Sequence, residues 1–240
     1  MSEKVSVAMA VYNGAKYLEA QIGSILPQLK ENDELVISYD ESSDDTLDFI
    51  RCYEKKDPRI KIIYDPGHGV TDNFSNAISN CKGDYIFLSD QDDIWLDKKV
   101  EMVMQCFHEK EPDLIVHNSR DFDDDTGLAA KSSFEKYRTG PGKLKNCIRS
   151  RCSGCCMAFT REMIDLILPI PVDEGYDHWI SALGEFCGSV SYIDEELLHH
   201  RLHVDNVTPA AHRSLPVVVR SRILLLQKLI NRAERARRKG

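Results

Sequence analysis

The 240-residue sequence lacks the two glycine-rich phosphate-binding signatures that are easiest to recognise. It contains no GxxxxGK[ST] segment and no GxGxxG segment, which excludes a P-loop and the usual dinucleotide fingerprint. No apolar run reaches the roughly 18 residues that a membrane-spanning helix needs. The first residues, Met1 to Lys4, lead into an apolar segment without the features of a signal peptide, so we expect a cytoplasmic protein.

A second cysteine pair at zinc-ribbon spacing is also missing. Cys152, Cys155 and Cys156 form a CxxCC cluster within the eight cysteines of the chain, but no matching pair follows. In a chain without an export signal, we expect reduced thiols rather than disulfides. We therefore interpret the cluster as packed thiols.

Positive charge is scarce except at the carboxyl end. The net charge is −8, yet residues 212–240 contain nine Lys or Arg and one acidic residue, a local charge of +8 that leaves −16 on residues 1–211. An acidic body predicts no nucleic-acid partner, and the basic tail predicts an anionic surface as its partner. The oligomeric state cannot be predicted from this pattern.

Strand and helix patterns alternate through the first half of the chain. Apolar runs at 5–11, 35–37, 60–64, 85–88 and 114–116 predict strands, and helical apolar spacing separates them. This alternation predicts an α/β fold with a mostly parallel central sheet flanked by helices. The polar stretch 121–145 is interpreted as a loop or insertion, and beyond it we expect a mixed sheet. We predict one domain, residues 1–211, followed by the tail, residues 212–240.

Polar residues follow three of the predicted strands, where open α/β sheets bind their ligands. Tyr12 follows the first strand and is suited to stacking on a base, while Asp40 follows the second and is suited to accepting a hydrogen bond from a pyrimidine or a ribose. Asp90, Asp92 and Asp93 follow the fourth strand in the segment SDQDDIW. Carboxylates this close repel one another, and a divalent cation between them would relieve the repulsion.

These segments resemble the family-two glycosyltransferases of the GT-A (Rossmann-like) fold, and their rhamnosyltransferase-like subgroup in particular. The resemblance rests on VSVAMAVYNGAKYLEAQIGSIL, YDESSDDT and GDYIFLSDQDDIW, followed in the same order by SGCCMAF, DHWISAL and LLHHRLHVDNVT. It covers roughly residues 4–208 and implies a nucleotide-sugar donor, Mn²⁺ or Mg²⁺ as cofactor, and a saccharide or polyprenyl-diphosphate-linked acceptor.

The resemblance also implies roles for individual residues. The donor would be bound by Ala10, Val11, Tyr12, Asn13, Asp40, Asp90, Gln91 and Asp92. The metal ion would be held by Asp90, Asp92 and His203, with Asp93 and Arg201 nearby. The acceptor would contact Trp95, Gly154, His178 and Trp179. Inverting transfer needs a base, which by position is Asp177; Tyr176 stands where this family often has His or Glu.

The tail predicts an amphipathic helix with Ile223, Leu226, Leu229 and Ile230 on one face and basic residues opposite. Such a helix suits an anionic membrane surface, which would make the protein peripheral on the inner face of the plasma membrane. Packing on the domain and pairing of two chains are the open alternatives.

The residues and the resemblance together predict a metal-dependent inverting glycosyltransferase that uses dTDP-rhamnose or a UDP-sugar. Two alternatives stay open: a sugar nucleotidyltransferase, and a non-catalytic module that binds nucleotide-sugars or membranes. Against the nucleotidyltransferase, no glycine-rich loop bearing Lys or Arg follows the first strand.

Overall fold

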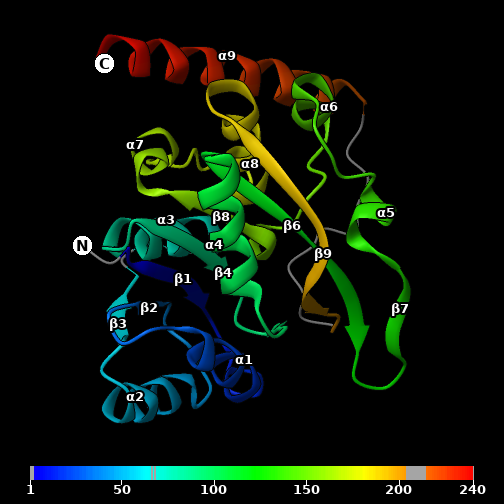
Figure 1. The fold of residues 1–240 in the computed structure, drawn as a ribbon. Coiled ribbons are helices and arrows are strands. Elements are labelled where there is room, and N and C mark those ends of the chain that lie inside the picture. Colours follow the sequence, from blue (N-terminus) through cyan, green and yellow to red (C-terminus); the bar gives the residue numbers. More distant parts are fainter. Residues whose placement is uncertain (1–2, 66, 68, 204–214, 240) are drawn as a thin grey trace.

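Parallel strands form the amino-terminal half of the sheet in the computed structural model, which describes residues 3–65, 67, 69–203 and 215–239 (Figure 1). The strands β1 (Val5–Val11), β2 (Glu34–Tyr39), β3 (Ile60–Tyr64) and β4 (Tyr85–Ser89) lie in the order β3-β2-β1-β4. Val11 pairs with Tyr39, and Met9 pairs with Ser89. The carboxyl ends of β1, β2 and β4 therefore meet at one end of the sheet.

Helices cover both faces of this sheet, as the alternating pattern predicts. The helices between the strands are α1 (Leu18–Ile25), α2 (Thr46–Lys56), α3 (Val70–Asn80) and, after β4, α4 (Lys99–Lys110). Val7 and Met9 of β1 pack into one apolar cluster with α1, α2 and α4, whereas Ala8 packs into a second cluster with α3. Successive side chains of a strand point to opposite faces, which explains why a strand buried on both faces is apolar throughout.

The carboxyl-terminal half of the sheet is mixed, which confirms the predicted architecture. After β4 the order is β8 (Met157–Thr160), β6 (Leu114–Asp123), β9 (Val190–Arg201) and the short β5 (Ile94–Trp95). β8 runs antiparallel to both β4 and β6, whereas β9 is parallel to β6. Because β8 is antiparallel to β4, its start lies beside the end of β4.

Of the two interpretations of residues 121–145, a loop or an insertion, the loop is wrong because the stretch has regular secondary structure. β6 continues to Asp123 and pairs with β7 (Gly127–Ser132), and two short helices follow, α5 (Ser133–Tyr137) and α6 (Lys143–Ile148). Most residues of β7 are exposed, so the strand has no apolar alternation that a sequence pattern could reveal. The short helices η1 (Leu26–Gln28), η2 (Gly154–Cys156), η3 (Arg161–Met163) and α7 (Ile164–Ile167) complete the chain up to α8 (Tyr176–Cys187).

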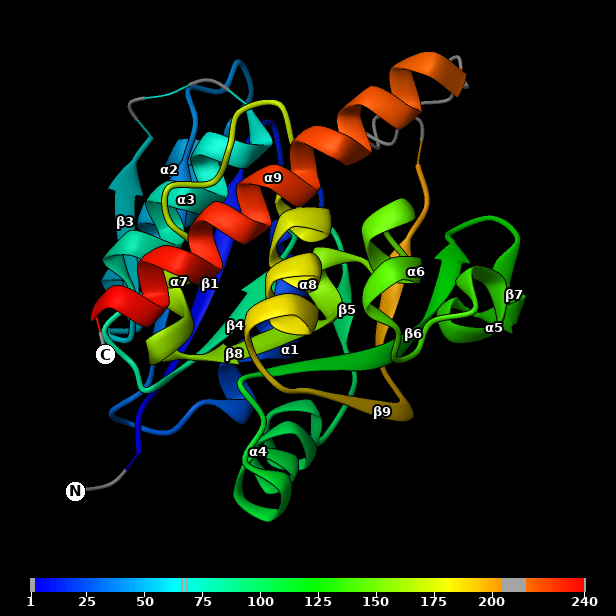
Figure 2. The ribbon, with the colours of Figure 1, turned by 90° about the horizontal axis from the view of Figure 1, so that it is seen from above.

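The tail forms one long helix, α9 (Leu215–Lys239), which packs on the domain. It lies across α8 and also touches α6 and α7 (Figure 2). Leu225 and Leu229 are fully buried there, while Ile223 and Ile230 are half exposed. The predicted apolar face is therefore only partly covered, because Leu229 packs against the domain and Ile230 faces outward, and of the open alternatives the structure shows packing on the domain. The predicted boundary between residues 211 and 212, and residues 204–208 of the last motif, lie outside the described residues.

Within the described part of the chain, no helix combines the length and the apolar character needed to cross a membrane.

Candidate functional site

The segment after β1 is held in place by the segments after β2 and β4. The side-chain amide of Gln91 accepts a hydrogen bond from the Tyr12 nitrogen and donates one to the Tyr12 oxygen, both 2.8 Å long. Asn13, in the left-handed region at φ 48°, receives the backbone N–H of Ser43 on its side-chain oxygen. These bonds leave the Tyr12 ring 54% exposed at the mouth of the site, where a base can stack on it.

The acidic turn after β4 contains three carboxylates in different surroundings. Burial and the charges of Asp93 and Asp92 raise the pKa of Asp90 to about 7, and the Tyr176 hydroxyl donates a 3.0 Å hydrogen bond to Asp90 Oδ1. Burial and the charge of Asp92 also raise the pKa of Asp93. Burial is the larger cause of both pKa shifts, and the repulsion predicted from the sequence adds to it; a bound cation would lower both pKa values again.

The end of β9 brings basic residues to this turn from more than one hundred positions away. His203 Nε2 lies 2.7 Å from Asp92 Oδ2, and the His203 ring stacks on Tyr17 with 4.6 Å between ring centroids. The Arg201 backbone N–H donates to Asp93 Oδ1 at 3.0 Å, and its Nε donates to the Asp92 carbonyl at 2.9 Å. The predicted R-x-H element therefore lies against the predicted acidic turn.

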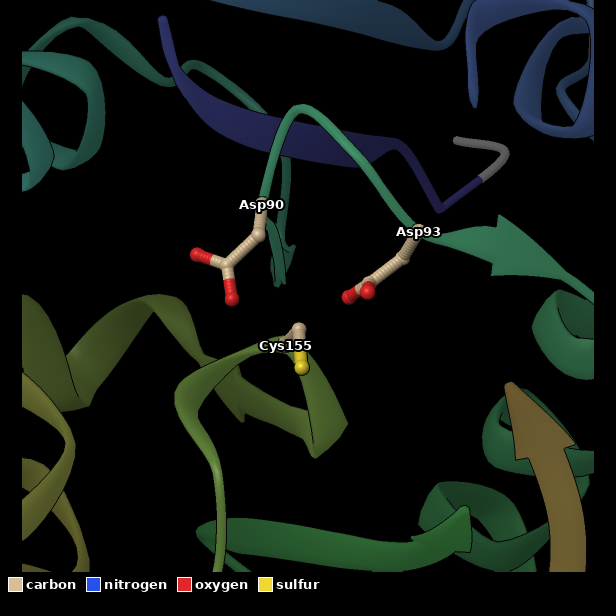
Figure 3. Close-up of side chains that lie close together, drawn as sticks. All are labelled: Asp90, Asp93 and Cys155. Carbon is tan, nitrogen blue, oxygen red and sulfur yellow. The ribbon is translucent and has the colours of Figure 1, made fainter. Parts of the chain in front are cut away.

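The donor atoms at this turn fit a divalent cation. One ligand atom each from Asp90, Asp93 and Cys155 lies within 4.8 Å of the others (Figure 3). Asp93 Oδ2 is buried and has no hydrogen-bond partner among the described residues, which is costly for a carboxylate unless a cation supplies the interaction. Asp92 and His203 add oxygen and imidazole donors beside this group, and both types suit Mn²⁺.

Asp177 lies in the first turn of α8, next to Tyr176. Its Oδ1 accepts the His178 backbone N–H at 2.7 Å, and its Oδ2 accepts the Ser150 hydroxyl at 3.3 Å. Burial raises the pKa of Asp177, although the backbone hydrogen bond from His178 acts in the opposite direction. A higher pKa makes the carboxylate a better proton acceptor.

The two tryptophans do not agree with the predicted acceptor contact. Trp179 is 1% exposed in the apolar cluster beneath α9, and its Nε1 donates to the Ile167 carbonyl at 2.9 Å. Trp95 is 3% exposed, and the Lys99 ammonium lies 3.9 Å from its ring centroid. Neither ring offers a face to a saccharide.

Four further predicted contacts are occupied by the protein itself. His178 is buried and lies 2.8 Å from the Asn146 carbonyl through Nε2. Val11 has its side chain in the core, and its carbonyl accepts hydrogen bonds from the Asp40 backbone and the Asn73 side chain. Gln91 uses its amide on the Tyr12 backbone, and Gly154 is buried against a tyrosine ring. Two other predicted donor contacts remain beside the site. Ala10 is partly buried in β1, and Asp40 accepts the Gly69 N–H on its Oδ2 at 3.4 Å.

Gly154 makes room for the tyrosine that holds Asp90. A Cβ at this position would lie 2.2 Å from the Tyr176 ring, which cannot move without losing its bond to Asp90. Gly154→Ala should therefore destabilise the fold by about 1–3 kcal/mol, measured by chemical denaturation, and weaken donor binding. Gly23→Ala is the matched control, because Gly23 is an exposed position of α1 where a Cβ would meet nothing within 4 Å, and the change should stabilise the helix by up to about 1 kcal/mol. Equal stability of the Gly154 variant and the unmodified protein would contradict this role.

Three residues of the site escaped the sequence prediction: Cys155, Tyr176 and His200. Burial lowers the pKa of His200, but its bond to Asp121 and the charges of Asp93 and Asp90 outweigh burial and raise it to about 10. His200 precedes the predicted R-x-H element, yet no feature of the sequence indicates that His200, rather than the adjacent His199, belongs to the site. Cys155 reaches the carboxylates because β8 is antiparallel to β4, a pairing that no local pattern reveals. For Tyr176, the sequence feature that could have pointed to the site is its position next to the predicted base, Asp177.

The fold is shared with solved glycosyltransferases. S. aureus TarS 1-349 in complex with UDP-GlcNAc superposes with a TM-score of 0.73 at 16% identity, over 92% of this chain and 66% of that one. The mannosyltransferase PcManGT from Pyrobaculum calidifontis, solved with GDP-Man and Mn²⁺, gives 0.65 at 14% identity, over 100% and 76%. At these identities the likeness establishes the GT-A-like fold alone.

Curated relatives are glycosyltransferases of bacteria. Glycosyltransferase GlyG of Streptococcus pneumoniae is 31% identical over 141 residues, which cover 58% of this chain and 45% of GlyG. The putative glycosyltransferase EpsH of Bacillus subtilis is 27% identical over 222 residues, which cover 88% and 64%. The chain thus spans about half to two thirds of the length of these relatives.

The sequence model described as glycosyl transferase family 2 matches residues 6–168, which include the segment after β1, Asp40 and the acidic turn. The predicted family is confirmed, while the rhamnosyltransferase-like subgroup stays a prediction. The chain belongs to glycosyl transferase family 2.

Proposed function

We propose that the protein transfers a sugar from a nucleotide-sugar donor to a hydroxyl group of a saccharide or lipid-linked saccharide, with inversion at the anomeric carbon and with a divalent metal ion. The observation that carries the proposal is one juxtaposition. The exposed Tyr12 ring, the acidic turn with His203, and the Tyr176–Asp177 start of α8 meet at the carboxyl ends of the strands.

The donor half of the site is built to hold a nucleoside diphosphate. Tyr12 offers an exposed ring for the base, and Asp40 lies at the end of the neighbouring strand to accept a hydrogen bond from the base or the ribose. Asp90, Asp92 and His203 would hold Mn²⁺ or Mg²⁺, with Asp93 and Cys155 within reach. When bound, the ion neutralises the negative charge that develops on the diphosphate leaving group.

The acceptor half of the site needs a proton acceptor, and Asp177 supplies one. The acceptor oxygen forms a bond to the anomeric carbon while the bond from that carbon to the diphosphate oxygen breaks. The hydroxyl proton passes to Asp177, and the electron pair of the broken bond leaves with the nucleoside diphosphate. Attack from the face opposite the diphosphate inverts the anomeric configuration.

The names of two relatives favour this reaction and a glycan of the cell envelope. WfgD of Escherichia coli, 28% identical over 75% of this chain, is named as a glucosyltransferase from UDP-Glc to GlcNAc-diphosphoundecaprenol. TuaG of Bacillus subtilis, 34% identical over 42% of this chain, is named as a putative teichuronic acid biosynthesis glycosyltransferase. WfgD supports a nucleotide-sugar donor and a polyprenyl-diphosphate-linked acceptor, and TuaG supports a role in glycan biosynthesis.

The product distinguishes the proposed reaction from its alternatives. The full chain is incubated with UDP-, dTDP- and GDP-sugars in turn and Mn²⁺, and we expect one donor to raise the melting temperature and to release free nucleoside diphosphate. Release of pyrophosphate from a nucleoside triphosphate and a sugar phosphate would instead identify a nucleotidyltransferase. A raised melting temperature without any product, in the presence of a series of saccharide acceptors, would identify a binding module.

A further inference from the structure

Helix α9 has two apolar sides, and only one of them is used by the domain. Leu225 and Leu229 are fully buried against the domain. Basic residues secure this docking: Arg222 Nε donates to the Ile148 carbonyl at 2.7 Å, Lys228 pairs with Asp173, and Arg232 donates to the Pro169 carbonyl at 2.9 Å. This side of α9 is therefore occupied by contacts with the domain.

The second apolar side is a stripe that faces outward. Val219, Ile223, Leu226 and Ile230 are spaced by four, three and four residues, which aligns them along one flank of a helix. Val219, Ile223 and Ile230 are 56%, 51% and 50% exposed, and Leu226 is partly buried. A folded domain gains nothing from exposing a continuous apolar stripe, so the stripe indicates a partner.

Helix α6 extends this surface. Leu144 and Ile148, four residues apart on α6, are 71% and 62% exposed, and Ile148 is bonded through its carbonyl to Arg222 of α9. Both ribbon views show α6 beside α9 (Figures 1 and 2). Seven of the twelve exposed large apolar residues of the described chain lie on α6, on α9 or at Val172 beside them. We call this the α6–α9 surface.

The charge on the α6–α9 surface is predominantly positive, with Glu234 of α9 and Asp173 next to Val172 as exposed acids. Residues 215–239 contain eight basic residues and one acidic residue, a net charge of +7 in a chain of net charge −8. Lys143, Lys145 and Arg149 are exposed on and next to α6, and residues 139–151 contain no acidic residue. Two copies of this surface would repel each other, which disfavours a symmetric pairing of chains through it.

We propose that the α6–α9 surface binds an anionic lipid bilayer. Ile223, Ile230 and the exposed α6 residues would enter the interface between headgroups and acyl chains, while the flanking Lys and Arg would contact anionic headgroups. The buried leucines keep α9 on the domain, so the helix carries the whole domain to the membrane. The inference concerns binding alone and stands independently of the proposed reaction.

The test compares point variants of the full chain, because deleting α9 would expose the core around Leu225 and Leu229. Unmodified protein should sediment with vesicles of phosphatidylcholine and phosphatidylglycerol, less so as salt rises, and not with phosphatidylcholine alone. Ile223→Ser with Ile230→Ser should weaken sedimentation at least about tenfold. Lys145→Gln and Arg149→Gln should each weaken it about fivefold at low salt. Leu128→Ser is the control, because Leu128 is equally exposed, at 55%, but lies on β7.

Three outcomes would overturn the proposal. The first is that the stripe variants have the melting temperature of the unmodified protein and bind vesicles as strongly as it does. The second is binding to neutral and anionic vesicles alike. The third is a dimer in light scattering that the stripe variants convert to a monomer without any vesicle binding, which would make a second copy of the chain the partner.

Discussion

Asp92→Ala should abolish metal-dependent donor binding and leave the fold intact. Replacing a residue that hydrogen-bonds to a metal ligand typically lowers metal affinity about 10- to 100-fold. Replacing a direct ligand should therefore lower it by at least about 100-fold. The fold should survive because the charge of Asp92 contributes to raising the pKa of Asp90 and of Asp93, and its removal relieves that repulsion. The melting temperature of the variant should be equal to or above that of the unmodified protein.

Calorimetric titration with UDP in Mn²⁺ and in EDTA measures this effect. Asp97→Ala is the control, because Asp97 is an exposed acid four residues beyond Asp93, the last carboxylate of the acidic turn. Among the described residues, Asp90, Asp93 and Cys155 bring their donor atoms within 4.8 Å of one another, whereas Asp92 contacts His203 beside this group, so the first set to test is Asp92 with His203. Unchanged Mn²⁺-dependent affinity in the Asp92 variant would contradict the first set, and Cys155→Ala would then be the informative variant.

The first half of the fold could be predicted because its signals are local. Three of the four parallel strands there, β1, β2 and β4, are mostly buried on both faces and are largely apolar, and each helix shows its own period. The carboxyl ends of parallel strands lie at the same end of a sheet. The proximity of Tyr12, Asp40 and the acidic turn could therefore be predicted from the sequence.

The rest of the site depends on contacts between distant segments. Cys155 reaches the acidic turn through an antiparallel pairing, and His200 does so through a strand that begins more than sixty residues after the end of β6. No periodicity encodes such pairings. The tryptophans show the limit of arguing from residue type, because a large aromatic ring serves the core as well as a sugar site, and here both rings are in the core.

The tail shows a different limit. Leu229 and Ile230 are adjacent in the sequence and almost equally apolar, yet one is fully buried and the other is half exposed. A hydrophobic periodicity gives the width of an apolar face and does not say which part of it the domain covers. Only the contacts with α6 and α8 divide the broad face of α9 into a docked side and an outward stripe.

Asp177→Asn should remove most of the transfer and leave donor and metal binding nearly unchanged. The amide keeps the shape of the side chain: its oxygen can still accept the His178 N–H, and its NH₂ group can donate to the Ser150 hydroxyl oxygen. It cannot accept a proton near neutral pH. General-base assistance is typically worth about 10²- to 10⁴-fold, so we expect kcat to fall within that range while donor affinity holds.

Asp173→Asn is the matched control for this variant, because Asp173 is exposed and pairs with Lys228 of α9. It removes a carboxylate four residues from Asp177 and should leave transfer unchanged. Near-normal turnover of the Asp177 variant would move the search for the base to Glu174, which is buried and 3.4 Å from the Lys228 ammonium. The anomeric configuration of the product, read by NMR, tests the mechanism separately. A base that activates the acceptor for attack opposite the diphosphate requires inversion, so a retained configuration would exclude single displacement whatever the rate of the variant.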